Sequence, residues 1–219
     1  RLKSKAAGFN NITSPSRRIG ERSETAGVEG LLKACDDGFE DHVPIISVEN
    51  LAQKVGHFAA QFYDHPSEKM KVIAITGTNG KTSCAWFITQ ALTKLGVKTA
   101  MMGTIGCGFL NDLNENSLTT PDAISVQKNL AQFKAQGAEV VVLEASSHSL
   151  VQGRLNGVDV DVAVFTNLTR DHLDYHKTMQ DYGSAKKRLF TDFKVKHAVI
   201  NIDDDFGRAL GENYQGALT

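Results

Sequence analysis

One run of residues, 72–83, constrains this chain more than any other. It begins with an unbroken apolar stretch, which is typical of a strand buried on both faces of a parallel sheet. Two glycines follow, and Gly77 and Gly80 allow a tight turn whose backbone N–H groups can approach an anion. Lys81 then adds a positive charge where a helix is expected to begin. The run therefore predicts a strand, a phosphate-binding turn and a helix.

The turn predicts that the protein spends ATP or GTP. Thr82 offers a hydroxyl that can ligate Mg²⁺ directly after the lysine, as in other phosphate-binding loops. The common pattern G-x-x-x-x-G-K-[ST] would place a glycine at position 75, where this chain has Ile75, so the loop is shorter. The alternative is an ordinary strand–turn–helix corner with a surface lysine. The order of strand, glycines, lysine and threonine favours the phosphate loop.

Composition narrows the class of protein. The 219 residues suffice for one large domain or two small ones. A net charge of −1 with no long basic run gives no electrostatic support to nucleic-acid binding. The three scattered cysteines fit neither a disulfide framework nor a zinc site, which indicates a reducing cytoplasm. No apolar run approaches the roughly 20 residues that a membrane span needs, so no membrane association is expected.

The first half of the chain has one clear element before the phosphate loop. Residues 1–40 are poorly patterned, and 44–48 form a short strand candidate. An amphipathic helix is expected over 49–63, and 64–67 look like a link into a second unit. The expected buried face of this helix carries Leu51, Val55, Phe58, Ala59 and Phe62.

From residue 71 onward strands and helices alternate, which predicts an α/β fold with a mostly parallel sheet flanked by helices. The strand candidates are 72–76, 98–102, 139–144, 161–166 and 197–202. The helix candidates are 82–95, 122–136, 179–190 and 205–210. In such sheets ligands bind beyond the carboxyl ends of the strands, so we expect the functional residues to follow the strands directly.

Two strand ends carry candidate functional groups. Glu144 ends a buried strand and is a candidate Mg²⁺ ligand, with a polar strand end or helix cap as the alternative. The hydroxyls and imidazole of 146–148 could equally bind a substrate or form a turn. Arg154 could hold a carboxylate or phosphate, although an isolated surface arginine is usually only solvated.

The segment 171–176 contains two carboxylates and two histidines just past another strand, which indicates metal or proton chemistry. Zinc lacks a supporting cysteine or H-E-x-x-H partner, so Mg²⁺ is favoured. Asp122 is explained by helix capping, which leaves the adjacent Thr119 and Thr120 unexplained. On spacing alone, Lys186 belongs to the basic face of a solvated helix.

Taken together, these segments resemble the Mur ligase family, with a P-loop NTPase-like central domain. The phosphate loop alone would also fit folylpolyglutamate synthetases. The resemblance covers residues 43–210 and depends on the segments 76–82, 119–122, 144–148, 152–154, 165–168, 171–176 and 185–186. It implies an ATP-dependent ligase of peptidoglycan assembly that forms an amide bond through an acyl phosphate. The implied acceptor is UDP-N-acetylmuramoyl-L-alanyl-D-glutamate, and the implied amine is a diamino acid, with meso-diaminopimelate favoured and L-lysine possible.

The resemblance also implies cofactors and the residues that hold them. ATP phosphates would be held by Gly77, Thr78, Asn79, Gly80, Lys81, Thr82 and Ser83. One Mg²⁺ would be held by Thr82 and Glu144, and a second with help from His172. Lys186 matches the family's carbamylated lysine (N6-carboxylysine), which overturns its interpretation as a solvated residue. Capture of CO₂ needs a neutral amine, so burial or neighbouring cations should lower its pKa. The implied catalytic residues are Lys81, Glu144, His172 and Lys186.

The UDP-muramoyl-peptide would be bound by Thr119, Thr120, Ser146, Gln152 and Arg154, and by Ser16 in a first uridine-binding segment. We expect a partial, incomplete α/β N-terminal domain over 1–68 and an incomplete ATP-binding domain over 69–219. The C-terminal ligase domain, which would select the diamino acid, is expected to lie past residue 219. A cytoplasmic monomer is expected. The alternatives are another Mur ligase, a folylpolyglutamate synthetase-type ligase, or a nucleotide-binding fragment without catalysis.

Overall fold

The computed structural model describes residues 47–115, 118–214 and 216–218. Contacts within the chain separate two compact units, Arg1–Glu49 and Asn50–Thr219, and nearly all the described residues belong to the second. Within these described ranges no helix combines the length and the apolar character that crossing a bilayer requires. Ser16 and most of the strand candidate 44–48 lie outside the described residues, and Ser47 and Val48 are not in a strand.

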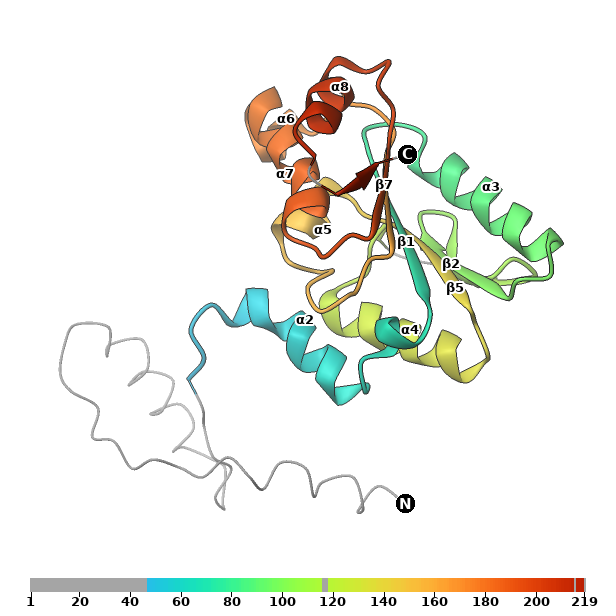
Figure 1. Ribbon diagram of the computed structural model, residues 1–219. Coiled ribbons are helices and arrows are strands. Elements are labelled where there is room, and N and C mark those ends of the chain that lie inside the picture. Colours follow the sequence, from blue (N-terminus) through green and yellow to red (C-terminus); the bar gives the residue numbers. More distant parts are fainter. Residues whose placement is uncertain (1–46, 116–117, 215, 219) are drawn as a thin grey trace. The chain divides into compact units, whose positions relative to one another are not determined.

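A mixed sheet forms the centre of the second unit (Figure 1). Its strands are β1 (Lys71–Thr76), β2 (Thr99–Gly103), β3 (Gly106–Phe109), β4 (Asp112–Asn114), β5 (Val140–Glu144), β6 (Val162–Phe165), β7 (His197–Ile200) and β8 (Ala217–Leu218). The spatial order is β4-β3-β2-β5-β1-β6-β7-β8. The pairs β2–β3 and β3–β4 are antiparallel, and the other described pairs are parallel. Because β1 lies in the middle with β5 and β6 on either side, their carboxyl ends meet at one edge.

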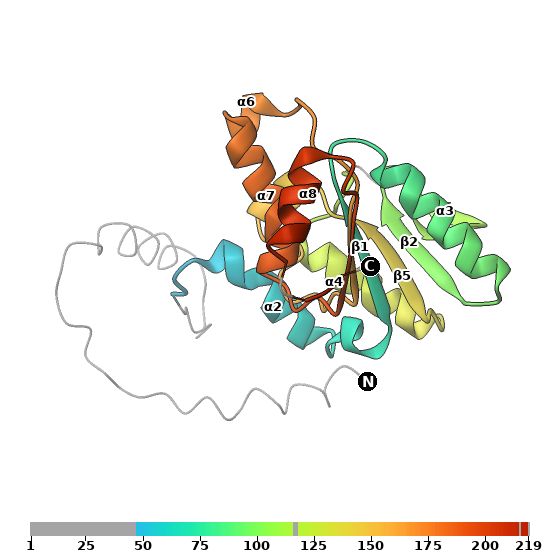
Figure 2. The same cartoon turned by 45° about the horizontal axis from the view of Figure 1, so that its top comes forward.

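Helices cover both faces of the sheet (Figures 1 and 2). They are α2 (Leu51–Phe62), the 3₁₀ helix η2 (Pro66–Lys69), α3 (Lys81–Lys94), α4 (Ala123–Ala135), α5 (Ser147–Val151), α6 (Leu173–His176), α7 (Met179–Thr191) and α8 (Asp205–Glu212). One face packs against α3, and the opposite face packs against α4, α7 and α8. Parallel strands buried on both faces need apolar side chains at successive positions, which explains the unbroken run in β1.

Successive side chains of β1 point to opposite faces of the sheet, which divides the core into two layers. Val72 and Ala74 are fully buried in the larger layer with α4 and α7. Ile75 is fully buried on the other side with Ala85 of α3, and Ile73 packs against the same layer. Full burial of a valine or isoleucine side chain, as at Val72 and Ile75, contributes about 1.5–3 kcal/mol, so this strand anchors the phosphate loop that follows it.

The predicted α/β architecture is confirmed. Each of the five strand candidates from residue 71 onward coincides with an observed strand, and each of the four helix candidates with an observed helix, within a few residues. The antiparallel hairpin of β3 and β4 was not predicted, nor were the short helices α5 and α6 or the short strand β8. The hairpin strands are only four and three residues long, and Gly106 and Gly108 weaken the strand signal.

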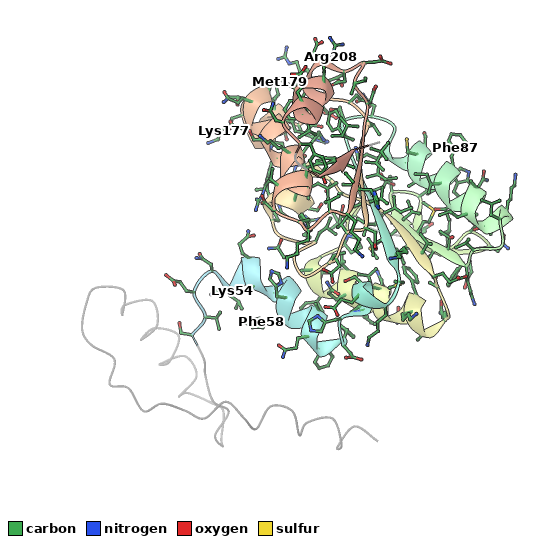
Figure 3. All side chains as sticks on the ribbon, in the orientation of Figure 1. Lys54, Phe58, Phe87, Lys177, Met179 and Arg208 are labelled. Carbon is green, nitrogen blue, oxygen red and sulfur yellow. The ribbon has the colours of Figure 1, made fainter. Side chains whose placement is uncertain are left out.

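The predicted helix before the loop exists as α2, but its expected buried face is only partly right, because Ala59 is buried while Leu51, Phe58 and Phe62 are exposed. Phe58 is 50% exposed and Phe62 is 74% exposed, and Figure 3 shows Phe58 pointing away from the fold. The buried residues are Gly56, Ala59 and Ala60. A Cβ on Gly56 would overlap the carbonyl of Asn156, so close backbone packing selected the small residues.

The predicted division into domains 1–68 and 69–219 stays a prediction. Residues 1–46 lie outside the described part of the chain. The last predicted element of the first domain, α2, packs against α4 and belongs to the compact unit that contains the sheet.

At the amino ends of the strands, Asp161 ties three strands together. Its carboxylate accepts hydrogen bonds from the backbone N–H of Val72 at 3.0 Å, from Lys71 Nζ at 3.1 Å and from Lys196 Nζ at 2.7 Å. Burial alone would raise the pKa of this carboxyl group, but these donors outweigh burial and hold its pKa below the usual range. The cluster is structural and lies at the edge opposite the phosphate loop.

We expect Asp161→Ala to lower the free energy of unfolding at pH 7 by about 2–3 kcal/mol, because a buried N–H loses its charged acceptor. The exposed neighbour in Asp159→Ala should cost under about 0.5 kcal/mol. Because the folded pKa of Asp161 is lowered, its contribution is present above the unfolded pKa of about 3.9 and disappears as pH falls through the folded pKa. Urea unfolding of both variants between pH 7 and pH 2.5 measures this. Equal stability of the two variants at pH 7 would contradict the assignment.

Candidate active site

The predicted phosphate loop, residues 77–82, joins β1 to α3 and includes its first residues. Gly77 has φ +146° and Gly80, which caps α3, has φ +81°, so both adopt backbone conformations that favour glycine. A Cβ on Gly77 would also overlap the hydroxyl of Thr166. The first N–H groups of α3 have no partner within the helix, and its positive end faces the turn. The start of α3 can therefore bind an anion.

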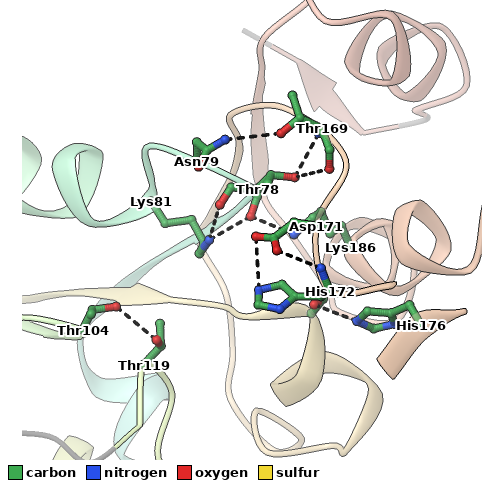
Figure 4. Close-up of polar contacts among 12 residues, drawn as sticks. Thr78, Asn79, Lys81, Thr104, Thr119, Thr169, Asp171, His172, His176 and Lys186 are labelled. Carbon is green, nitrogen blue, oxygen red and sulfur yellow. Dashed lines mark hydrogen bonds and ion pairs between the residues drawn. The ribbon is translucent and has the colours of Figure 1, made fainter. Parts of the chain in front are cut away.

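The segment after β6 fixes the shape of this loop. The N–H of Thr78 donates to the carbonyl of Asn167 at 2.8 Å, and the N–H of Asn79 donates to Asn167 Oδ1 at 3.0 Å. Thr166 Oγ1 donates to the carbonyl of Asn79 at 2.6 Å. The N–H of Thr169 donates to Thr78 Oγ1 at 3.0 Å (Figure 4). These bonds preorganise the loop, so the N–H groups of Thr78 and Asn79 are already satisfied and the helix start is left for the anion.

Two lysines meet at the carbonyl of Gly77. Lys81 Nζ donates to it at 2.9 Å and also to the carbonyl of Thr78 at 2.8 Å, and Lys186 Nζ donates to it at 2.7 Å. Burial lowers the pKa of Lys81, while Glu144 and Asp171 act in the opposite direction. Both ammonium groups therefore lie directly beside the loop that would hold the phosphates.

Lys186 is 1% exposed, so its interpretation from spacing as a solvated residue is wrong. Burial and the neighbouring charge of Lys81 lower the pKa of Lys186 to about 7, and Asp171 opposes them. Its Nζ lies 4.2 Å from the centre of the Tyr182 ring. Tyr182, Lys186 and Leu189 follow the helical spacing of the inner face of α7, so the lysine is turned toward the site.

The carboxylate of Glu144 lies at the carboxyl end of β5 and is 1% exposed. Thr82 Oγ1 donates to its Oε2 at 2.9 Å. The N–H of Thr104 donates to its Oε1 at 2.8 Å, and the hydroxyl of Thr104 donates to Oε2 at 3.3 Å. Thr104 was not predicted as a site residue, although it follows strand β2, and residues at such strand ends are where ligands bind.

Gly103 permits this approach. A Cβ at this position would overlap the carboxylate of Glu144, with further contacts at 2.8 and 2.9 Å to its Cδ and Cγ. Only a residue without a side chain lets the end of β2 come this close to β5. Gly103 is therefore a second site residue that was not predicted from the sequence.

The residues expected to bind the acceptor lie together beside Glu144. Thr120 Oγ1 donates to the carbonyl of Glu144 at 2.7 Å, and the N–H of Ser146 donates to Thr120 Oγ1 at 3.2 Å. Arg154 Nη1 donates to the carbonyl of Thr120 at 2.7 Å, and its Nε and Nη2 donate to Gln152 Oε1 at 2.8 and 2.6 Å. Figure 4 shows Thr119 bonded to Thr104, with 3.1 Å between their Oγ1 atoms. This chain of hydrogen bonds joins the threonine pair to the phosphate loop.

The histidine segment lies against α7. His172 is the N-cap residue of α6 and has φ +51°, and its Nε2 is 3.5 Å from Asp171 Oδ2. The His172 ring lies 6.0 Å from Tyr182, the residue that also contacts Lys186, and 5.0 Å from the ring of His148. His172 and Lys186 are thus gathered around one buried aromatic ring.

The geometry fits the way proteins hold Mg²⁺. Among the residues described here no cluster of three His, Cys, Asp or Glu side chains forms a closed metal cage, as zinc would need. Mg²⁺ instead takes one or two protein carboxylates together with substrate phosphates. Two oxygens on adjacent positions of an octahedral Mg²⁺ lie about 3 Å apart, given metal–oxygen distances of about 2.1 Å. Thr82 Oγ1 and Glu144 Oε2 have this separation, at 2.9 Å.

We expect Gly103→Ala to lower the free energy of unfolding by about 1–3 kcal/mol, because the new methyl group overpacks against Glu144. In a Glu144→Ala background the same change should cost under about 1 kcal/mol, since the clashing carboxylate is gone. Urea unfolding of the four proteins measures the coupling. Additive effects of the two substitutions would mean that the end of β2 does not need a glycine at position 103 in order to lie beside Glu144.

The comparisons with known proteins place this site in a family. The model of the Mur ligase middle domain matches residues 75–218. The UDP-N-acetylmuramoyl-L-alanyl-D-glutamate–2,6-diaminopimelate ligases of Coxiella burnetii and Chromobacterium violaceum are 49% and 52% identical over 177 and 178 residues. These alignments cover 81% and 80% of this chain and 36% of each relative. The chain thus spans about a third of the length of the curated relatives it matches.

Solved structures agree with this assignment. A structure of a UDP-N-acetylmuramoyl-L-alanyl-D-glutamate–2,6-diaminopimelate ligase has 39% identity and a TM-score of 0.71, covering 79% of this chain and 36% of the other. Folylpolyglutamate synthase of Mycobacterium tuberculosis, complexed with ADP and AMPPCP, has 15% identity, a TM-score of 0.59 and coverages of 77% and 46%. That second likeness concerns the fold alone. Because the family model matches residues 75–218 and the relatives are 49% and 52% identical, the chain belongs to the Mur ligase family.

Proposed function

We propose that this chain is the ATP-binding part of an ATP-dependent amide ligase of peptidoglycan assembly. The full-length gene product would add a diamino acid, meso-diaminopimelate, to UDP-N-acetylmuramoyl-L-alanyl-D-glutamate. The observation that carries the proposal is the position of Glu144, whose side chain meets Thr82 of the phosphate loop and whose carbonyl meets Thr120 of the threonine pair. One residue thus joins the nucleotide side of the site to the acceptor side. The names of the relatives at 49% and 52% identity support the choice of substrates.

The reaction needs two group transfers, since a carboxylate is a poor electrophile. An oxygen of the acceptor's free glutamate carboxylate bonds to the γ-phosphorus of ATP as the bond to the β,γ-bridging oxygen breaks and ADP leaves. The amine nitrogen of the diamino acid then bonds to the acyl carbon, the carbon–oxygen bond to phosphate breaks, and phosphate leaves while the amine loses its proton. The protein must hold two anionic groups together and offset their charge.

The residues of this chain would divide that task. Residues 77–83 would bind the ATP phosphates through the start of α3, and Lys81 would turn from the Gly77 carbonyl to the γ-phosphate. Thr119, Thr120, Ser146, Gln152 and Arg154 would bind the UDP-muramoyl-peptide, where the Arg154 guanidinium offers charge-assisted donors to an anionic group. Ser16, the sixth residue proposed for the acceptor, lies outside the described part of the chain.

Mg²⁺ would be held by Thr82 and Glu144 at one position, and by His172 and the Lys186 carbamate at a second. Bound there, it would offset the charge that develops on the transferred phosphoryl group. Lys186 suits carbamylation because burial and Lys81 bring its pKa to about 7, so the neutral amine is well populated near neutral pH. Its nitrogen would bond to the carbon of CO₂ and lose a proton, giving N6-carboxylysine.

We infer a cytoplasmic monomer that binds neither nucleic acid nor membrane. The net charge of −1 and the absence of a long basic run support the first exclusion. A cytoplasmic site is also where ATP and a nucleotide-linked precursor are both available.

To test the function, the full-length gene product is incubated with ATP, Mg²⁺, UDP-N-acetylmuramoyl-L-alanyl-D-glutamate and meso-diaminopimelate. ADP release should require both acceptor and amine, and the product should be the tripeptide precursor by mass. L-Lysine replaces diaminopimelate in a parallel reaction, and a folate replaces the muramoyl acceptor in another. ADP release that ignores the muramoyl acceptor, or that requires the folate, would refute the proposal.

Lys186→Ala should lower turnover by about 100-fold or more, because the site loses a charge that acts on the transferred phosphate. Short carboxylates such as formate or acetate should restore part of the activity by occupying the space of the carbamate. The control is Lys187→Ala, the exposed neighbour on α7, which should keep its activity. Incubation with ¹³C-bicarbonate should give a carbamate resonance that Lys186→Ala lacks. Full activity of Lys186→Ala together with no carbamate resonance would contradict this role.

A further inference from the structure

His176 lies inside the site, yet the proposed function gives it no task. It ends α6, is 6% exposed, and its Nε2 lies 2.8 Å from Ser147 Oγ. Ser147 is 2% exposed and is the first residue of α5. Two buried polar side chains from separate helices are therefore paired with each other (Figure 4 shows His176). Such a pair is costly to break, because the remaining group would be buried without a partner.

The His176 ring also contacts two aromatic rings that lie against the proposed metal ligands Lys186 and His172. It lies 5.1 Å from the ring of Tyr182 and 5.4 Å from the ring of His148. Tyr182 contacts the Lys186 ammonium at 4.2 Å, and His148 contacts the His172 ring at 5.0 Å. The Tyr182 ring therefore connects His176 to Lys186, and the His148 ring connects it to His172.

On its other side, His176 reaches the residues proposed for the acceptor. Its partner Ser147 directly follows Ser146, which caps α5 by accepting from the N–H of Ser149 at 3.1 Å. The hydroxyl of Ser146 lies 3.3 Å from that of Thr120. Any shift of the start of α5 would move the hydroxyl groups that face the acceptor.

The charge state of the ring suits this contact. Burial lowers the pKa of His176, and His148, Lys186 and His172 act in the same direction, while Asp181 opposes them. A neutral imidazole has one donating and one accepting nitrogen, so it can pair with a hydroxyl without bringing another cation beside Lys186.

We propose that His176 is a positioning residue that fixes α5 relative to His172 and Lys186. Through Ser147 it would set the acceptor hydroxyls, and through Tyr182 and His148 it would set the groups around the transferred phosphate. The inference depends on the proposed function, because its purpose is to hold the acceptor carboxylate at reacting distance from the γ-phosphate. Misplacement of about 1 Å between reacting groups can cost about 100-fold in rate.

The test compares three variants of the full-length gene product. His176→Phe keeps the ring but loses the bond to Ser147, and Ser147→Ala removes the same bond from the other side. Each should lower kcat by about 10- to 100-fold while the KM for ATP changes less than about twofold. The double variant should be no worse than the poorer single variant. His176→Gln, which can still bond to Ser147, should recover most of the loss.

His57→Phe is the matched control, since His57 is an exposed histidine on α2, and it should leave kcat unchanged. A second readout needs no substrate: the ring resonances of His172 in ¹⁵N–¹H spectra should shift in Ser147→Ala. If the wild type shows no acceptor-dependent ADP release, the proposed function fails, and the His172 shift still decides whether His176 transmits position. Unchanged kcat in His176→Phe, or unchanged His172 resonances in Ser147→Ala, would overturn the inference.

Discussion

The buried carboxylate of Glu144 is the constraint on which the site depends. A charged group that is 1% exposed is costly unless donors surround it, and the chain supplies them from two separate strand ends. Thr82 reaches it from the phosphate loop, and Thr104 reaches it from the end of β2. Gly103 leaves the space in which they meet. The loop, two strand ends and the threonine pair are thereby held in fixed positions, as the proposed phosphoryl transfer would require.

Two buried carboxylates at opposite edges of the sheet differ in their hydrogen-bond partners. This difference distinguishes a structural carboxylate from a candidate metal ligand. Asp161 is bonded to two lysine ammonium groups and a backbone N–H, so its charge is balanced by the protein. The hydrogen bonds to the Glu144 side chain in the described part of the chain come from hydroxyl and N–H groups, and none comes from a cation. Such a carboxylate can still attract a metal ion, which makes Glu144 the better candidate Mg²⁺ ligand of the two.

The sequence predicted the sheet, the main helices and the phosphate loop because each has a strong local signal. Apolar runs, helical periodicity and the glycine turn are all read within a dozen residues. What escaped prediction depends on close approach between distant segments. Gly103 and Thr104 matter only because β2 lies beside β5, and the buried face of α2 follows from Gly56 packing on a loop a hundred residues away. Residue types alone do not carry that information.

Lys186 shows most clearly why local pattern was not enough. Three consecutive basic residues on α7 look like a solvated surface. The helical spacing of Tyr182, Lys186 and Leu189 nevertheless places Lys186, the first of the three, on the inner face. Burying an ammonium group disfavours its charge, and Lys81 beside the same Gly77 carbonyl disfavours it further. A stability role alone would favour a leucine at such a position. A neutral amine beside a phosphate loop is instead what CO₂ capture needs, and the resulting carbamate would replace a poorly tolerated positive charge with a negative one that Lys81 and the proposed Mg²⁺ can balance.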